Sequence, residues 1–311
     1  MCFLIDRLKY KYRTMIFNEV TNPMKKLLPT HQQAMDKNDG FLFAGQFLRR
    51  LTLRRAAFKH LASVLLALVV LVSLSPASAQ NNPYVESLDA WAETLERFVD
   101  EQGRIDFVSL SKEPDDLKKF VDAVAQVSPK SHPDLFTTNE QIIAYHVNAY
   151  NALAMNNVID RNLPKHLNSF FRKAAFFKFH TVVIGGKKTN LYDYENRVIR
   201  PLGEARVHFV LNCMVVDCPQ LPMKVFTPES LETDLQVASK EFFNREKHVQ
   251  IDEQKKVVLL SAIMKFYTED YVESGKKQDL IAYANQFREQ SIPLDYKVKF
   301  LDYDWTINQS P

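Results

Sequence analysis

The sequence has few cysteines, few glycines and no long apolar run. Three cysteines and seven glycines among 311 residues exclude a disulfide-rich scaffold and a glycine-rich low-complexity chain. The apolar run from Leu61 to Leu74 holds 14 residues, whereas a helix needs roughly 18 or more to span a bilayer. We therefore expect a globular domain with no stable membrane span in the mature protein.

The apolar run instead has the features of a secretory signal peptide. Arginines and a lysine precede it, and the small residues of 76–79 follow it, at the positions that a signal peptidase reads. We predict cleavage near Ala79, which places the mature protein in the periplasm or outside the cell. An uncleaved anchor is the alternative.

The predicted cleavage divides the chain into three parts. Residues 1–48 form an unusually long leader, unless translation starts at Met24 or Met35. Residues 49–79 form the signal peptide, and residues 80–311 form a single mature domain.

Removal of the leader and signal reverses the net charge. The whole chain carries +3, but the mature part has 28 Lys and Arg against 33 Asp and Glu, or about −5. Nucleic-acid-binding proteins carry a basic face. We therefore expect no nucleic-acid partner.

Helical patterns outnumber strand patterns in the mature part. Apolar residues at helical spacing predict helices over 84–101, 115–127, 138–161, 191–200, 227–243, 261–271 and 279–287. One strand is expected to end at Ile184. Two more are expected to form a hairpin over 248–252 and 257–260, and a last strand is expected over 298–301. The fold class is therefore α+β: a single helix-rich domain with a small, mainly antiparallel sheet formed largely by the second half.

The helix expected over 138–161 is the most informative one. Thr138 and Gln141 have the spacing of a capping box, and apolar residues surround nearly the whole helix, which predicts a central position. Asn148 and Asn151 fall among those apolar residues. Because an unpaired buried amide costs roughly 1–3 kcal/mol, these amides either tie down the backbone of a neighbouring loop or line a site.

A second polar cluster follows in the segment 207–213. Its apolar residues alternate with His208 and Asn212, which predicts a strand that presents both polar side chains on one face. Cys213 then enters a loop, and Cys218 follows five positions later.

Glu195 lies within the apolar stripe of the helix expected over 191–200. A carboxylate in such a position is seldom buried without a partner. The alternatives are a salt bridge to Arg161 or Arg206, a pairing with His208, or simple exposure.

Several separated stretches of the chain resemble the domain of unknown function family 547. They are YHVNAYNA at 145–152, LYDYE at 191–195 with Arg200, HFVLNC at 208–213, CP at 218–219 and YDWTIN at 303–308. The resemblance covers most of residues 90–308, and a tryptophan is usual where this chain has His146, which argues against His146 as a ligand or catalyst. It implies family motif positions at Asn148, Asn151, Glu195, Arg200, His208, Asn212, Cys213 and Cys218.

The first interpretation of the two cysteines is a disulfide. Two thiols separated by four residues can pair in an oxidising compartment if their Cα atoms approach within about 7 Å. The bond would brace the loop and leave no free thiol.

The second interpretation is nucleophilic catalysis by Cys213. His208 would act as the base and Glu195 would orient its imidazole. Asn212 or Asn148 would donate to an oxyanion, with Asn151, Arg200 and Cys218 in supporting positions. In an ideal strand His208 and Cys213 project to opposite faces, so a bulge or turn must redirect the sulfur.

The third interpretation is a zinc ion held by His208, Cys213 and Cys218, but the cysteine spacing is unusual and no fourth ligand is evident. The glycines at 185–186 lack the spacing of a phosphate-binding loop. We therefore expect no metal and no cofactor.

We expect the functional cleft where the central helix, the Glu195 helix and the Cys213 strand meet. The hypothesis is an exported cysteine-dependent hydrolase or transferase that uses Cys213, His208 and Glu195 on an amide or thioester. The alternative is a non-enzymatic binding module of the cell envelope, stapled by a Cys213–Cys218 disulfide. Its partner would be an unidentified small-molecule or peptide-like ligand.

Overall fold

A computed structural model of the chain describes residues 82–311, and the predicted leader and signal peptide lie outside them. The longest helix in the described part, α5 (Asn139–Asp160), is buried on most of its sides. Thr138 and Gln141 form the predicted capping box, because each side chain accepts a hydrogen bond from the other residue's backbone N–H. The central position of this helix is confirmed.

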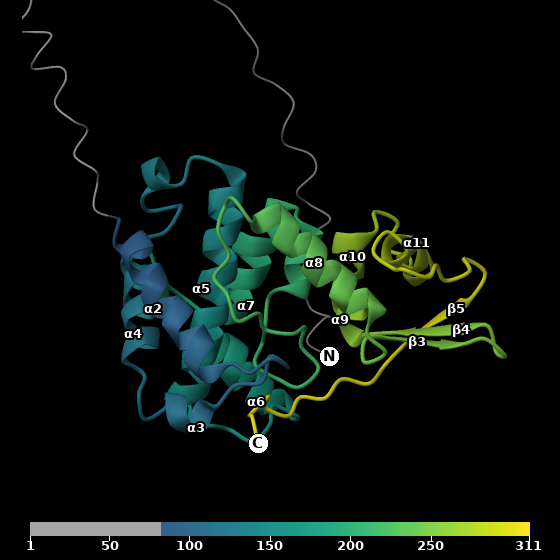
Figure 1. The fold of residues 1–311 in the computed structure, drawn as a ribbon, viewed down its shortest axis with the longest axis horizontal. Helices are drawn as coiled ribbons and strands as arrows, with labels where there is room; N and C mark the ends of the chain where they lie inside the picture. The colour runs from purple at the N-terminus through teal and green to yellow at the C-terminus, as the bar shows by residue number, and fades with distance from the viewer. Residues whose placement is uncertain (1–81) are drawn as a thin grey trace, which may run out of the picture. The chain divides into compact units, whose positions relative to one another are not determined.

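Helices of the first half lie beside α5 (Figure 1) and contribute with it to the larger hydrophobic core. They are α2 (Pro83–Phe98), the short α3 (Phe107–Leu110) and α4 (Asp115–Gln126). Helix α4 packs against α5, and α2 packs against α4. The turn after α2 requires a glycine, since Gly103 has a φ of 74° and a Cβ there would lie 2.8 Å from the backbone nitrogen of Leu221. The helices expected over 84–101 and 115–127 are confirmed to within a few residues.

Short helical pieces build the middle of the chain. They are α6 (Phe170–Ala174) with a π-helical turn (Ala175–Phe179), then the hairpin β1 (Val182–Ile184) and β2 (Lys187–Thr189), then α7 (Leu191–Tyr194) with a π-helical turn (Glu195–Ile199) and a 3-10 turn (Arg200–Leu202). The predicted helix over 191–200 is therefore present in three consecutive forms.

The strand expected over 207–213 is wrong. Residues Ala205–Phe209 form a 3-10 helix, and the chain then continues without regular structure to the cysteine loop. Val207 packs into the core around α5, whereas Phe209 packs into a second core. Apolar and polar residues therefore alternate in this segment because it contacts two cores, and not because it is a pleated strand.

The second half contains the smaller core. Its elements are α8 (Leu231–Asn244), β3 (Val249–Asp252), β4 (Val257–Leu260), α9 (Ala262–Phe266), α10 (Thr268–Tyr271), a 3-10 turn (Lys277–Asp279), α11 (Leu280–Ala284) and β5 (Lys297–Phe300). Strand β4 pairs antiparallel with β3 and parallel with β5. The α+β class and the location of the larger sheet in the second half are confirmed.

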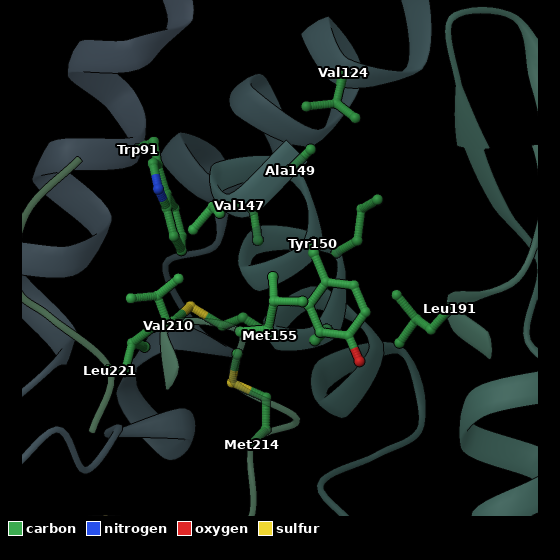
Figure 2. Packing of buried hydrophobic residues seen from close by; sticks show 14 of the residues in the cluster. Trp91, Val124, Val147, Ala149, Tyr150, Met155, Leu191, Val210, Met214 and Leu221 are labelled. Carbon is green, nitrogen blue, oxygen red and sulfur yellow. The ribbon is translucent and has the colours of Figure 1, made fainter. Parts of the chain in front are cut away.

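The C-terminal segment returns from the smaller core to the larger one (Figure 1). Isolated bridges join Thr306 to His166, Ile307 to Val215 and Gln309 to Ile105. Close to this segment, Val210 and Met214 pack with Met155 of α5 (Figure 2). The segment thereby fixes the cysteine loop against the central helix. None of the helices in the described part has the length and apolar character needed to cross a membrane.

Candidate functional site

Cys213 and Cys218 are paired at disulfide distance, with their Cα atoms 6.3 Å apart. Their separation lies within the range that a disulfide permits. The backbone N–H of Cys213 donates to Cys218 Sγ at 3.0 Å. Cys218 is buried, whereas Cys213 is half-buried. The first interpretation of the two cysteines therefore fits the geometry.

The side chain of Asn212 braces this loop from inside. Its Nδ2 donates to the carbonyl of Pro219 at 2.7 Å, and its Oδ1 accepts from the N–H of Met214 at 2.7 Å. Asn151 of α5 holds the same stretch, since it accepts from the N–H of Asn212 at 2.8 Å and donates to the carbonyl of Val210 at 3.0 Å. Both amides are thus used to fix the backbone.

Asn148 performs the same task one turn earlier on α5. It accepts from the N–H of Phe226 at 3.0 Å and donates to the carbonyl of Phe226 at 2.8 Å and to the hydroxyl of Tyr84 at 3.3 Å. Of the two alternatives for the buried amides of α5, the contacts of Asn148 and Asn151 fit the first, in which they tie down the backbone of a neighbouring loop. These bonds commit Asn148 and Asn212 to the fold, so the geometry does not offer them as oxyanion donors.

Glu195 is buried, with 7% of its surface exposed, and two tyrosines hold its carboxylate. Tyr150 of α5 donates to Oε2 at 3.0 Å, and Tyr267 donates to Oε1. Burial and then the charge of Glu195 raise the pKa of both hydroxyls well above the ordinary value, so both remain donors at neutral pH. In the part of the chain that the structure describes, neither an arginine nor His208 donates a hydrogen bond to Glu195. Arg206 binds Glu204 and Glu232 instead.

His208 is paired with a carboxylate that the sequence analysis did not single out. Its Nε2 lies 2.8 Å from Oδ2 of Asp270, and its ring stacks on Tyr267 with centroids 3.8 Å apart. Arg200 donates from Nε and Nη2 to the two oxygens of the same carboxylate, each at 2.7 Å. Burial opposes the charge of Asp270, but the hydrogen bonds from Arg200 and His208 outweigh it and lower the pKa to about 2.

Tyr303 connects the cysteine loop to this polar cluster. Its hydroxyl lies 3.5 Å from Cys218 Sγ and 3.6 Å from Cys213 Sγ. Burial raises the pKa of this hydroxyl far above its ordinary value, and the charges of Asp217 and Glu195 add to the effect. Within the described residues no hydrogen bond joins His208 to Cys213.

The site residues that sequence reasoning missed differ in how they could have been found. Tyr150 and Tyr303 lie inside stretches that carry the family resemblance, but a tyrosine in an apolar helix or near a terminus indicates packing first. Tyr267 and Asp270 lie outside those stretches. Asp270 is 62 residues from His208 in sequence, so no local pattern marks it.

The described residues contain no group of three or more His, Cys, Asp and Glu side chains that could hold a metal ion. The two sulfurs are directed at each other, so the geometry gives no support to a zinc ion on His208, Cys213 and Cys218.

Two shallow surface hollows, of about 540 and 450 Å³, lie away from the cysteine loop, one beside β3 and one beside α7.

The fold and the site together define an α+β domain in which a disulfide-paired loop adjoins a buried cluster of tyrosine, carboxylate, imidazole and guanidinium groups. Residues 134–243 match the model of the family described as "Protein of unknown function, DUF547". Residues 134–243 therefore carry a DUF547 family domain, as the sequence resemblance implies. All eight motif positions named from the sequence lie within the match, whereas Tyr267, Asp270 and Tyr303 lie beyond it.

No curated protein and no solved structure matches the chain.

Proposed function

We propose that the domain is a non-enzymatic binding module of the cell envelope, and that the Cys213–Cys218 disulfide holds its loop in a fixed conformation. The observation that carries this proposal is the pairing of the two sulfurs. A sulfur in a disulfide is not a nucleophile. The amides of Asn151 and Asn212 support the same role, because both fix the backbone at the ends of the loop.

Aromatic rings beside the disulfide supply a surface for a ligand. Tyr303 lies 4.7 Å from Trp305 and 5.4 Å from Phe266 between ring centroids, and all three side chains are half-buried. Rigid aromatic side chains give large contact areas at low cost in conformational entropy. A small-molecule or peptide-like ligand with an apolar group fits such a surface.

The state of the thiols tests the proposal. The full chain, purified from the oxidising compartment without reductant, is treated with iodoacetamide and mapped by mass spectrometry. We expect no alkylation at Cys213 or Cys218 before reduction and alkylation of both after reduction and unfolding. Rapid alkylation of Cys213 in the native protein would refute the staple.

A cysteine hydrolase or transferase is the second candidate, and one observation favours it. Cys213 is half-buried and lies next to Tyr303, close to the Glu195 cluster. If an external dithiol reduced the disulfide, the thiolate of Cys213 would form a bond to an acyl carbon and expel an amine or thiol, and water would then release the acid. In this form Asp270, rather than Glu195, orients His208.

Hydrolysis of a chromogenic thioester by the chain, reduced with dithiothreitol and then freed of it under anaerobic conditions, separates the two candidates. The hydrolase requires turnover that appears after this reduction and disappears in Cys213→Ser. The binding module requires the same background rate for the reduced chain, the oxidised chain and the variant.

A further inference from the structure

One segment of the chain is strongly cationic although the mature part is acidic. Residues 161–192 contain seven Lys and Arg and not one Asp or Glu. This segment holds α6, its π-helical continuation and the hairpin β1–β2. Such a concentration of one charge favours contact with a surface of opposite charge.

The same segment exposes three phenylalanines. Phe171 is 79% exposed, Phe179 is 76% exposed and Phe170 is 57% exposed. Phe170 and Phe171 are adjacent on α6, with ring centroids 5.7 Å apart, and Phe179 ends the π-helical turn that continues the helix. Single exposed apolar residues are ordinary, but three large rings on one short helical unit indicate a contact surface.

Positive groups stand beside these rings. Arg172 is exposed and contacts the ring of His166 at 2.7 Å, and the Nζ of Lys178 lies 3.9 Å over the ring of Tyr192. Neither of these contacts is with a carboxylate, so neither neutralises the positive charge. We call Phe170, Phe171, Arg172, Lys178 and Phe179 the phenylalanine face.

We propose that the phenylalanine face docks on the surface of an anionic lipid bilayer. The three rings would enter the boundary between headgroups and acyl chains, and Arg172 and Lys178 would contact the lipid phosphates. Cations that lie among exposed apolar side chains match this boundary, where apolar and anionic groups are separated by a few ångströms. The proposal goes beyond the function of the cysteine loop and does not depend on the state of the thiols.

A local fluorescent reporter tests the proposal in the full chain. Phe171→Trp places an indole on the phenylalanine face, and Leu294→Trp places one at a position that is also exposed, at 65%, in the segment before β5. Each variant is mixed with vesicles of phosphatidylcholine alone or of phosphatidylcholine with phosphatidylglycerol, both containing brominated acyl chains. The unsubstituted chain, which contains Trp91 and Trp305, gives the baseline. We expect quenching and a blue shift beyond this baseline only for the indole at position 171, and only with the anionic vesicles.

The reporter pair also controls for the apolar run at 61–74. Attachment through that run alone would bring both variants to the vesicles without burying either indole. Equal quenching of the two reporters, or equal quenching by the two kinds of vesicle, would therefore overturn the proposal. Binding of RNA in a gel shift without quenching by anionic lipid would overturn it in favour of a nucleic-acid surface.

Charge variants in the Phe171→Trp background measure the electrostatic part. Each surface cation contributes about a fivefold change in binding to an anionic bilayer. Arg172→Gln with Lys178→Gln should therefore weaken vesicle binding by about 25-fold, while Lys255→Gln with Lys276→Gln, which removes the same charge elsewhere, should leave binding within about twofold. Unchanged near-UV circular dichroism confirms that the variants are folded. Equal weakening by the two pairs would contradict the proposed face.

Discussion

At the scale of single residues, Glu195 is a buried carboxylate whose hydrogen bonds come from two tyrosine hydroxyl groups. Tyr150 and Tyr267 each donate to one of its oxygens. A buried carboxylate that loses one donor keeps its desolvation cost, so each hydroxyl is worth more than an ordinary hydrogen bond.

Removal of the Tyr267 hydroxyl should therefore destabilise the domain. We expect Tyr267→Phe to lower the free energy of unfolding by about 2 kcal/mol, since hydrogen bonds to charged groups contribute about 1.5–3 kcal/mol. Urea unfolding at neutral pH measures the change.

Tyr271 provides a matched control on the next turn of chain. Its ring also packs against His208, but its buried hydroxyl has no hydrogen-bond partner among the described residues. Tyr271→Phe should leave stability unchanged or raise it. Equal losses in Tyr267→Phe and Tyr271→Phe would mean that ring packing, and not the bond to Glu195, is responsible.

Asp270 links stability to pH. Its pKa falls from 3.8 to about 2 on folding because Arg200 and His208 bind the charged form. A carboxyl group with a lowered pKa stabilises the fold above its unfolded pKa, and this contribution is lost as the pH falls from about 4 to about 2. The shift corresponds to about 2 kcal/mol.

Asp270→Asn should lower the free energy of unfolding at pH 7 by at least that amount, and the difference from the wild type should shrink as the pH falls from 4 to 2. Urea unfolding across this range measures it. Asp295→Asn removes the same charge from an exposed carboxylate and should change stability little at any pH. A constant difference between wild type and Asp270→Asn would contradict the linkage.

At the scale of elements, the cysteine loop is held from three sides. The disulfide closes it, Asn151 of α5 and the side chain of Asn212 fix its ends, and the C-terminal segment adds a bridge from Val215 to Ile307. Its stability is therefore shared between a covalent bond and hydrogen bonds that remain after reduction.

Loss of the disulfide should weaken the domain without unfolding it. A crosslink that closes so short a loop contributes about 2 kcal/mol by restricting the unfolded chain. We expect Cys213→Ser with Cys218→Ser to lower the free energy of unfolding by about that amount, as measured by urea unfolding. Dithiothreitol should destabilise the wild type equally and the double variant not at all. A reductant effect on the double variant would assign the loss to something other than this bond.

The elements also explain which features the sequence could predict. The capping box at Thr138, the all-round apolar character of α5 and the structural use of Asn148 are local signals, and the structure has each of them. The segment 205–209 could not be predicted as a 3-10 helix, because its alternation arises from contacts with two different cores. Asp270 could not be predicted as the partner of His208, because sequence patterns do not report pairings across 62 residues.

At the scale of the whole described unit, two cores meet along the segment that carries His208. Val207 belongs to the core around α5 and Phe209 to the core of the second half, while His208 between them binds Asp270 of α10. The site is therefore assembled from both halves of the domain. Substitutions in the smaller core are therefore expected to shift Tyr267 and Asp270, and with them the hydrogen bonds to Glu195 and His208.

The C-terminal segment has a consequence for biosynthesis. Tyr303, which contacts both sulfurs, follows Cys218 by 85 residues, so a ribosome releases the two thiols well before it adds the tyrosine that covers them. An oxidant that acted on the nascent chain would therefore meet an uncovered pair of thiols, and the hydroxyl of Tyr303 would then contact a bond already formed.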